Sequence, residues 1–163
     1  MSVIRKTVSK FFTLISLKGI KHGERCKCNF KCSFTKSTEI GTNCHFNGMK
    51  ISGSGMVKIG DNFHSGKNIR VITTFHNFDH GTALPYDNTS YSRDVVIDDN
   101  VWLGESVMIL GGVHIGEGAV IQAGSVVCKD VPALAIAGGH PAVAFKYRDK
   151  EHYYELKKSG SYM

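Results

Sequence analysis

The sequence is poor in the features that mark several common protein classes. Only three of its 163 residues are proline and one is tryptophan, and no run of 18 apolar residues occurs that would span a membrane as a helix. Lys6, Lys10 and Lys18 interrupt the apolar positions of the first twenty residues, and an A-x-A-like cleavage site is lacking, which argues against a secretory signal peptide. These absences predict a cytoplasmic protein with a single globular domain.

The basic charge of the sequence is not concentrated in one block. The net charge is +6 and the isoelectric point is near 9.1. Lysine and arginine are scattered from Arg5 to Lys158 without a run of five or six, so a nucleic-acid-binding face is not expected. The charge favours a solvated surface with one cluster that binds the phosphates of a small molecule.

The five cysteines do not form a metal-binding pattern. Cys26, Cys28 and Cys32 give the spacing C-x-C-x3-C, but the second half of a zinc site is missing. Cys28, Cys32, Cys44 and Cys128 fall at positions of the repeat described below, where a free thiol acts as a small buried apolar group. The sequence therefore predicts no metal ion and a reducing compartment.

What the sequence has in abundance is a period of six residues. Aliphatic residues recur at Ile97, Leu103, Ile109, Ile115, Ile121 and Val127. Four residues after each of these stand Val101, Val107, Val113, Ala119, Ser125 and Val131. A helix cannot satisfy a period of six, whereas three flat strands turned by about 120° form a triangular coil of about 18 residues. The period predicts a prism of stacked strands, with the aliphatic position inside and the small position near each corner.

The period extends back to Cys28 with one irregularity. Ile40 and Ile59 are 19 residues apart, so one extra residue must be absorbed at a corner near Gly48, Gly53 or Gly55. Counted from Cys28 onward, the repeat gives about five coils. Corner positions with positive φ suit glycine, and three glycines are expected there: Gly104, Gly116 and Gly124.

The period breaks between Val71 and Ile97, which predicts an inserted loop over residues 77–94. Loops that project from a rigid scaffold commonly carry the chemistry of a protein. We expect a helical or cap segment over residues 1–27, the coils over 28–146 and a short helix with a tail over 147–163. Apolar residues at helix-like spacing in the first segment leave open a weak peripheral contact with a membrane, and these are Val3, Ile4, Val8, Phe11, Phe12 and Ile15.

Four segments carry a resemblance to a known family. They are VIDDNVWLG at 96–104, GVHIGEGAVIQAGSVV at 112–127, KDVP at 129–132 and GHPA at 139–142. They resemble the hexapeptide-repeat acyltransferases, and within them the sugar and polysaccharide O-acetyltransferases related to maltose and galactoside acetyltransferase. The resemblance implies an all-β, left-handed parallel β-helix and a homotrimer with active sites between subunits. It also implies transfer of an acetyl group from acetyl-CoA to a hydroxyl of a sugar or surface polysaccharide precursor.

The same resemblance assigns residues to the site. TFHNFD at 74–79 matches the stretch that carries the catalytic histidine, with His76 in its place. The coenzyme A contacts implied by the resemblance, together with neighbouring groups at the repeat corners and the C-terminal end, are Trp102, Gly104, Ala123, Lys129, Lys146 and Arg148. The inserted loop supplies the expected acceptor contacts, Asn77, Asp79, His80 and Tyr86.

Histidine suits this reaction because it titrates near neutrality and can take a proton from a weakly nucleophilic hydroxyl. Its second ring nitrogen needs a hydrogen-bond acceptor, for which Asp79, Asp87 and a backbone carbonyl remain alternatives. His80 is the second candidate for the base. The nature of the acceptor stays open among nucleotide sugars, lipid-linked glycans, free sugars, antibiotics and amines.

Two other functions compete with acetyl transfer. A zinc enzyme similar to the γ-class carbonic anhydrases would use three histidines, for which His76, His80 and His114 are the candidates. A non-catalytic β-helix could instead use its flat faces as a binding scaffold, although such a protein would have no need of His76 or of the phosphate-side lysines.

Overall fold

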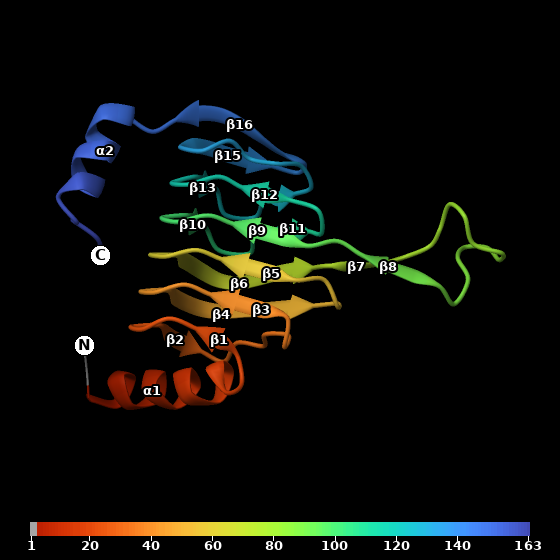
Figure 1. Cartoon of the computed structure of the whole chain (residues 1–163), viewed down its shortest axis with the longest axis horizontal. Coiled ribbons are helices and arrows are strands. Elements are labelled where there is room, and N and C mark those ends of the chain that lie inside the picture. Colours follow the sequence, from red (N-terminus) through yellow and green to blue (C-terminus); the bar gives the residue numbers. More distant parts are fainter. Residues whose placement is uncertain (1–2) are drawn as a thin grey trace.

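The strands of the protein stack into a three-sided prism, with one helix across an end and a second, C-terminal helix beside the stack (Figure 1). The computed structural model describes residues 3–163, with side chains from residue 6 onward. The first face consists of β1 (Lys21–His22), β3 (Thr38–Ile40), β5 (Val57–Ile59), β9 (Val95–Ile97) and β12 (His114–Ile115). All four pairings on this face are parallel.

The second and third faces share two long strands that bend across the corner between them. β4 (His45–Ser52) and β6 (His64–Ile72) begin on the second face and end on the third. The second face also contains β2 (Lys27–Phe30), β10 (Trp102–Leu103), β13 (Val120–Ile121), β15 (Ala135–Gly139) and β16 (Ala142–Tyr147). The third face continues with β11 (Met108–Leu110) and β14 (Val126–Val127).

The predicted parallel β-helix is confirmed, with about six coils in place of the expected five. The additional coil arises at the N-terminal end, because Lys21 and His22 of β1 already pair with Glu39 and Ile40 of β3. The coils thus begin within the stretch 1–27 that was expected to be a cap. Only α1 (Val3–Leu17) of that stretch is helical, and Met1 and Ser2 lie outside the described residues.

Both sets of side chains that the period predicts lie in the core. The six aliphatic residues from Ile97 to Val127 are each at most 1% exposed, and the six small residues from Val101 to Val131 are each at most 5% exposed. Adjacent coils place these side chains directly over one another, since Leu103 pairs with Ile121 and Ile109 with Val127. Each Å² of apolar surface removed from water contributes about 25 cal/mol to the free energy of folding, so this interior is the main source of stability.

The irregular coil lies where the sequence placed it. The register shifts between His45 and Asn47, and Gly48 and Gly53 have φ values of +96° and +102°. β3 and β5 nevertheless pair in register, with Ile40 opposite Ile59. The extra residue is therefore absorbed at corners, as the glycines indicated.

The glycines of the regular coils have a different role from the one predicted for two of them. Gly124 does have positive φ, at +74°, but Gly104 and Gly116 do not. A Cβ at Gly116 would lie 2.5 Å from the backbone nitrogen of Ala133, and one at Gly104 would collide with the backbone of Ala123. Gly104 and Gly116 are required because the next coil passes too close for a side chain.

An asparagine ladder, formed by Asn43, Asn62 and Asn100, runs along the corner between the first and second faces. All three residues have φ near +57°, from +54° to +60°, which asparagine tolerates better than most residues. Asn43 Nδ2 donates to Asn62 Oδ1 at 2.9 Å, and Asn62 Nδ2 donates to Asn100 Oδ1 at 3.1 Å. The ladder ends on Tyr153 of α2 (Lys150–Lys158), whose hydroxyl accepts from Asn100 Nδ2 at 2.9 Å.

The two kinds of glycine predict different effects of substitution on stability. Gly116→Ala forces backbone atoms apart and should lower the free energy of unfolding by about 3 kcal/mol, the upper part of the range for overpacking. Gly124→Ala adds a Cβ into open space, so only the unfavourable φ remains, at about 1 kcal/mol. Urea unfolding of both variants measures the difference, and Gly124→Asn should restore most of the smaller loss. Equal losses for the two alanine variants would contradict this account.

Candidate active site

The inserted segment forms a hairpin that projects from the corner between the third and first faces. β7 (Thr74–His76) pairs antiparallel with β8 (Ser90–Ser92), with His76 opposite Ser90. The hairpin extends away from the prism on the side opposite α2 (Figure 1). Two apolar residues between its strands are open to solvent, with Phe78 62% and Leu84 95% exposed. The predicted catalytic histidine is thus held at the end of a strand and not in a loose loop.

The ring of His76 stacks on the ring of Tyr86. Their centroids are 3.8 Å apart and the planes differ by 9°. Asn77 joins the two arms of the hairpin, since its Nδ2 donates to Thr89 Oγ1 and its Oδ1 accepts from the His80 amide, both at 3.1 Å. The structure therefore gathers the predicted acceptor residues Asn77, His80 and Tyr86 around His76 on one hairpin.

Asp87 folds the loop and does not contact His76. Its Oδ1 accepts from the Thr89 amide at 2.9 Å and from Thr89 Oγ1 at 2.5 Å, and its Oδ2 accepts from the Thr82 amide at 2.8 Å. These hydrogen bonds, the one from the Thr89 hydroxyl above all, lower the pKa of Asp87 to about 2. The carboxylate is thus ionised at neutral pH and engaged within its own turn.

Among residues 3–163, neither Asp79 nor a backbone carbonyl forms a hydrogen bond with the His76 ring. His76 and Asp79 are both exposed. The contact that fixes the plane of the imidazole within the described residues is the stacking on Tyr86.

A second group of aromatic side chains lies on the outer surface of the second face. His45, His64 and Trp102 are stacked by the register of three successive coils, and the rings of His45 and His64 are 4.4 Å apart. The pKa of His45 is lowered to about 4, chiefly by partial burial and to a smaller extent by the charges of His64 and Lys27. Burial also lowers the pKa of His64. Both histidines are therefore neutral at pH 7, and Trp102 is 53% exposed beside them.

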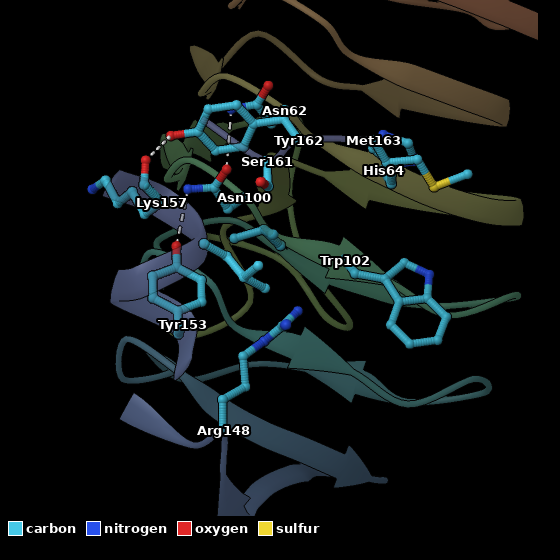
Figure 2. A pocket seen from close by; sticks show the side chains of 12 residues that line it. Asn62, His64, Asn100, Trp102, Arg148, Tyr153, Lys157, Ser161, Tyr162 and Met163 are labelled. Carbon is cyan, nitrogen blue, oxygen red and sulfur yellow. Dashed lines mark hydrogen bonds between the residues drawn. The ribbon is translucent and has the colours of Figure 1, made fainter. Parts of the chain in front are cut away.

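A cavity of about 400 Å³ lies between this surface and the C-terminal helix. Figure 2 shows Trp102 and His64 on the strand side and Arg148, Tyr153 and Lys157 on the side of α2. The other residues that line the cavity are Asn62, Asn100, Val101, Leu156, Ser161, Tyr162 and Met163. Of the residues expected to bind coenzyme A, Trp102 and Arg148 share this cavity.

Hydrogen bonds hold the helical wall of the cavity in place. Arg148 Nε donates to the carbonyl of Gly118 at 2.7 Å. Glu117 Oε1 accepts from Tyr153 Oη at 2.8 Å and from Lys157 Nζ at 2.6 Å. Burial alone would raise the pKa of Glu117, but the hydrogen bonds from Lys157 and Tyr153 outweigh it and lower that pKa. The hydrogen bond to Glu117 correspondingly raises the pKa of Lys157.

The other predicted cofactor residues lie elsewhere on the prism. Gly104 and Ala123 are in contact on successive coils, at the corner between the second and third faces. Lys129 follows β14 and is exposed at the corner from which the hairpin projects. Lys146 is exposed on β16, opposite Ile136 of β15. A single chain does not bring these residues into one group with His76.

The candidate zinc ligands are also separated. His114 Nε2 lies 2.9 Å from Asp98 Oδ2 on the first face, whereas His76 and His80 belong to the hairpin. Across the part of the chain that the structure describes, no three histidine, cysteine or acidic side chains are grouped as a metal site.

Sequence reasoning missed the cavity residues of the C-terminal segment. Tyr153, Leu156, Lys157 and Tyr162 lie beyond the six-residue period, so no pattern connects them with the coils. The sequence signal that pointed to this part of the surface was asparagine at the same corner of three successive coils, at Asn43, Asn62 and Asn100.

The stacked hexads and the projecting hairpin together define a parallel β-helix protein of the hexapeptide-repeat class. Residues 94–129 match the family model described as bacterial transferase hexapeptide (six repeats). The chain belongs to the hexapeptide-repeat transferases.

Named relatives support the same family. The chain is 35% identical to the galactoside O-acetyltransferase of Escherichia coli K12 over 127 residues, which cover 76% of this chain and 62% of that relative. The chain thus spans less than two thirds of the length of this relative. It is also 34% identical over 101 residues to a chloramphenicol acetyltransferase of Escherichia coli, covering 61% of this chain and 48% of that one.

Solved structures share the architecture. A galactoside acetyltransferase in complex with coenzyme A superposes with a TM-score of 0.70 at 26% identity, over 93% of this chain and 82% of that chain. A hexapeptide-repeat acetyltransferase from Vibrio cholerae with acetyl coenzyme A gives a TM-score of 0.71 at 26% identity, over 90% and 88% of the two chains.

The low pKa of His45 predicts a pH dependence of stability. An unfolded histidine has a pKa of about 6.5, so between this value and about 4 the unfolded state binds the proton and the folded state does not. The free energy of unfolding should therefore fall as the pH decreases through this window. His45→Gln should reduce the loss in urea unfolding between pH 7.5 and 5, leaving a part due to His64. His152→Gln on α2 is the control, and an unchanged slope in His45→Gln would refute the interpretation.

Proposed function

We propose that the protein transfers an acetyl group from acetyl-CoA to a hydroxyl of a sugar or surface polysaccharide precursor, with His76 as the general base. The observation that carries the proposal is the long break in the hexad period, where β7 and β8 form a hairpin with an exposed His76 stacked on Tyr86. The names of the relatives, which include galactoside O-acetyltransferase, support the reaction type.

The chemistry requires one base that acts twice. His76 takes the proton of the acceptor hydroxyl as its oxygen attacks the thioester carbonyl of acetyl-CoA. The tetrahedral intermediate then collapses, the carbon–sulfur bond breaks, and the imidazolium returns the proton to the sulfur of CoA. Tyr86, stacked on the imidazole, keeps the ring plane fixed during both transfers. Asn77, Asp79 and His80 lie on the same hairpin, where they would contact the acceptor.

The cofactor assignments are part of this proposal. Gly104 and Ala123 leave a corner without bulky side chains, along which a pantetheine arm can lie. Lys129, Lys146 and Arg148 supply cationic groups for the phosphates of CoA. Trp102, half exposed above the cavity, offers a flat apolar wall for the cofactor or the acceptor.

The site would be completed in a homotrimer. His76 and the cavity beside Trp102 lie on opposite sides of one chain, so they can meet only if the hairpin of one subunit reaches the second face of the next. The exposed Phe78 and Leu84 between the strands of the hairpin are apolar groups that such an interface would cover. Five free cysteines are consistent with a cytoplasmic location.

The His76 assignment predicts a loss of turnover without loss of cofactor binding. A general base contributes about 10²–10⁴-fold, so His76→Ala should lower kcat by that factor while the Kd of acetyl-CoA stays unchanged. Transfer to a panel of sugars, with release of free CoA as the signal, measures the effect. His80→Ala is the matched control on the same hairpin and should retain most of its activity. If the His80 variant is inactive and the His76 variant is not, the base has been misassigned.

A shared site predicts that two inactive variants complement each other. Refolding His76→Ala together with Trp102→Ala produces mixed trimers, in which about a quarter of the sites combine an intact hairpin with an intact second face. Activity should therefore return in the mixture although each variant alone is inactive or strongly impaired. His76→Ala mixed with a second hairpin variant, Tyr86→Ala, is the control and should remain inactive. Light scattering that shows a monomer would contradict the shared site.

A further inference from the structure

Helix α1 packs on the end of the prism through a mixed face, in which Leu17 joins the core, Phe12 packs against it, and three hydroxyl groups form hydrogen bonds. Thr13 Oγ1 accepts from the Cys28 amide and Ser16 Oγ from the Cys32 amide, each at 2.9 Å. Ser9 Oγ donates to Asn29 Oδ1 at 3.0 Å. These hydroxyls satisfy backbone and side-chain groups at the open edge of β2, where no preceding coil exists.

The outer side of α1 also carries apolar residues, and these face solvent. Val8, Phe11, Leu14 and Ile15 are 43%, 59%, 74% and 41% exposed. The outer side of a surface helix normally carries charged and polar residues instead. The outer side of α1 is therefore an apolar stripe that the fold itself does not bury.

The charge of the protein is concentrated at the same end. Residues 6–37, which form α1 and most of the first coil, contain a single acidic residue, Glu24, and eight basic residues. The eight are exposed: Lys6, Lys10, Lys18, Lys21, Arg25, Lys27, Lys31 and Lys36. Residues 38–163 contain eleven basic and thirteen acidic residues. The helix lies at one end of the prism (Figure 1), so this end is a basic pole.

We propose that the basic pole docks on an anionic lipid bilayer, with α1 lying in the plane of the interface. Phe11 and Leu14 enter the boundary between headgroups and acyl chains, and the surrounding lysines contact lipid phosphates. The helix docks without crossing, because no helix among the described residues is long and apolar enough to span a bilayer.

The same observations disfavour other occupants. Two copies of the basic pole would face each other with like charges, which opposes a contact between two α1 helices. A nucleic acid would neutralise the lysines but would leave Phe11 and Leu14 in water. A bilayer satisfies both features, because it offers phosphate and hydrocarbon in one surface.

Vesicle flotation tests this proposal with the full-length protein. The wild-type protein should float with vesicles of phosphatidylcholine containing roughly one third phosphatidylglycerol and should stay in solution with pure phosphatidylcholine. Binding should weaken at about 1 M salt, where the Debye length falls to about 3 Å. Absence of binding to the anionic vesicles at low salt would overturn the proposal.

Paired variants separate the two contributions. Phe11→Ser with Leu14→Ser should lower the vesicle partition coefficient by about tenfold or more, because both side chains lose their apolar insertion. Val143→Ser, an exposed apolar residue on β16, is the control and should bind like the wild type. Lys6→Glu with Lys10→Glu should also reduce binding by about tenfold or more. Lys150→Glu with Lys158→Glu makes the same change in net charge on α2 and should have little effect.

Three results would reject the bilayer as the partner. Equal losses in the α1 and α2 charge variants would mean that net charge alone drives binding. Tighter binding to duplex RNA than to anionic vesicles, with the same dependence on Lys6 and Lys10, would indicate a nucleic acid. A lower molar mass in light scattering for the Phe11 and Leu14 variant would assign the stripe to a contact between copies. Circular dichroism of each variant verifies the fold, and neither the vesicle signal nor its controls depend on acetyl transfer.

Discussion

The structure depends on the in-register stacking of parallel coils. Each coil forms backbone hydrogen bonds with the next, as where Leu103 lies opposite Ile121. The spacing between coils that these hydrogen bonds set leaves room in the interior for one aliphatic side chain per face of each coil. The constraint extends to the corners, where Gly104 and Gly116 allow the neighbouring backbone to pass. Because the interior is filled in this way, residues that act on other molecules are left to the corners, the outer faces and the insertion.

A solenoid also has two ends, and their covers shape the available surface. At the first end α1 replaces a missing coil with its hydroxyls and with Leu17, while Phe11 and Leu14 on its outer side stay exposed. At the other end β16 pairs antiparallel with β15, and α2 folds back onto the asparagine ladder through Tyr153. The cavity beside Trp102 exists because α2 is held at this corner by Glu117 and Lys157.

The hairpin follows a different principle from the coils. Its shape is fixed by local hydrogen bonds, above all those that Asp87 accepts from Thr82 and Thr89. This local folding holds His76 against Tyr86 while the tip stays exposed. The hairpin therefore carries His76 outward from the corner of its own prism.

The sequence by itself determined the coil, because a six-residue period of aliphatic residues fits stacked flat strands and not a helix. The break in the period predicted the insertion that forms the hairpin, and the resemblance of residues 74–79 singled out His76. Other features depended on contacts between distant residues. The extra coil begins at Lys21 and His22 of β1, and these two residues are not aliphatic, so the six-residue period does not show it. The role of Gly104 and Gly116 depends on how closely the backbone of the following coil passes. The distance between His76 and Trp102 also depends on the tertiary structure. His76 lies at the corner between the third and first faces, whereas Trp102 lies on the second face. The orientation of α1 was decided by contacts with the first coil, where Thr13 and Ser16 accept from the Cys28 and Cys32 amides and Leu17 joins the core.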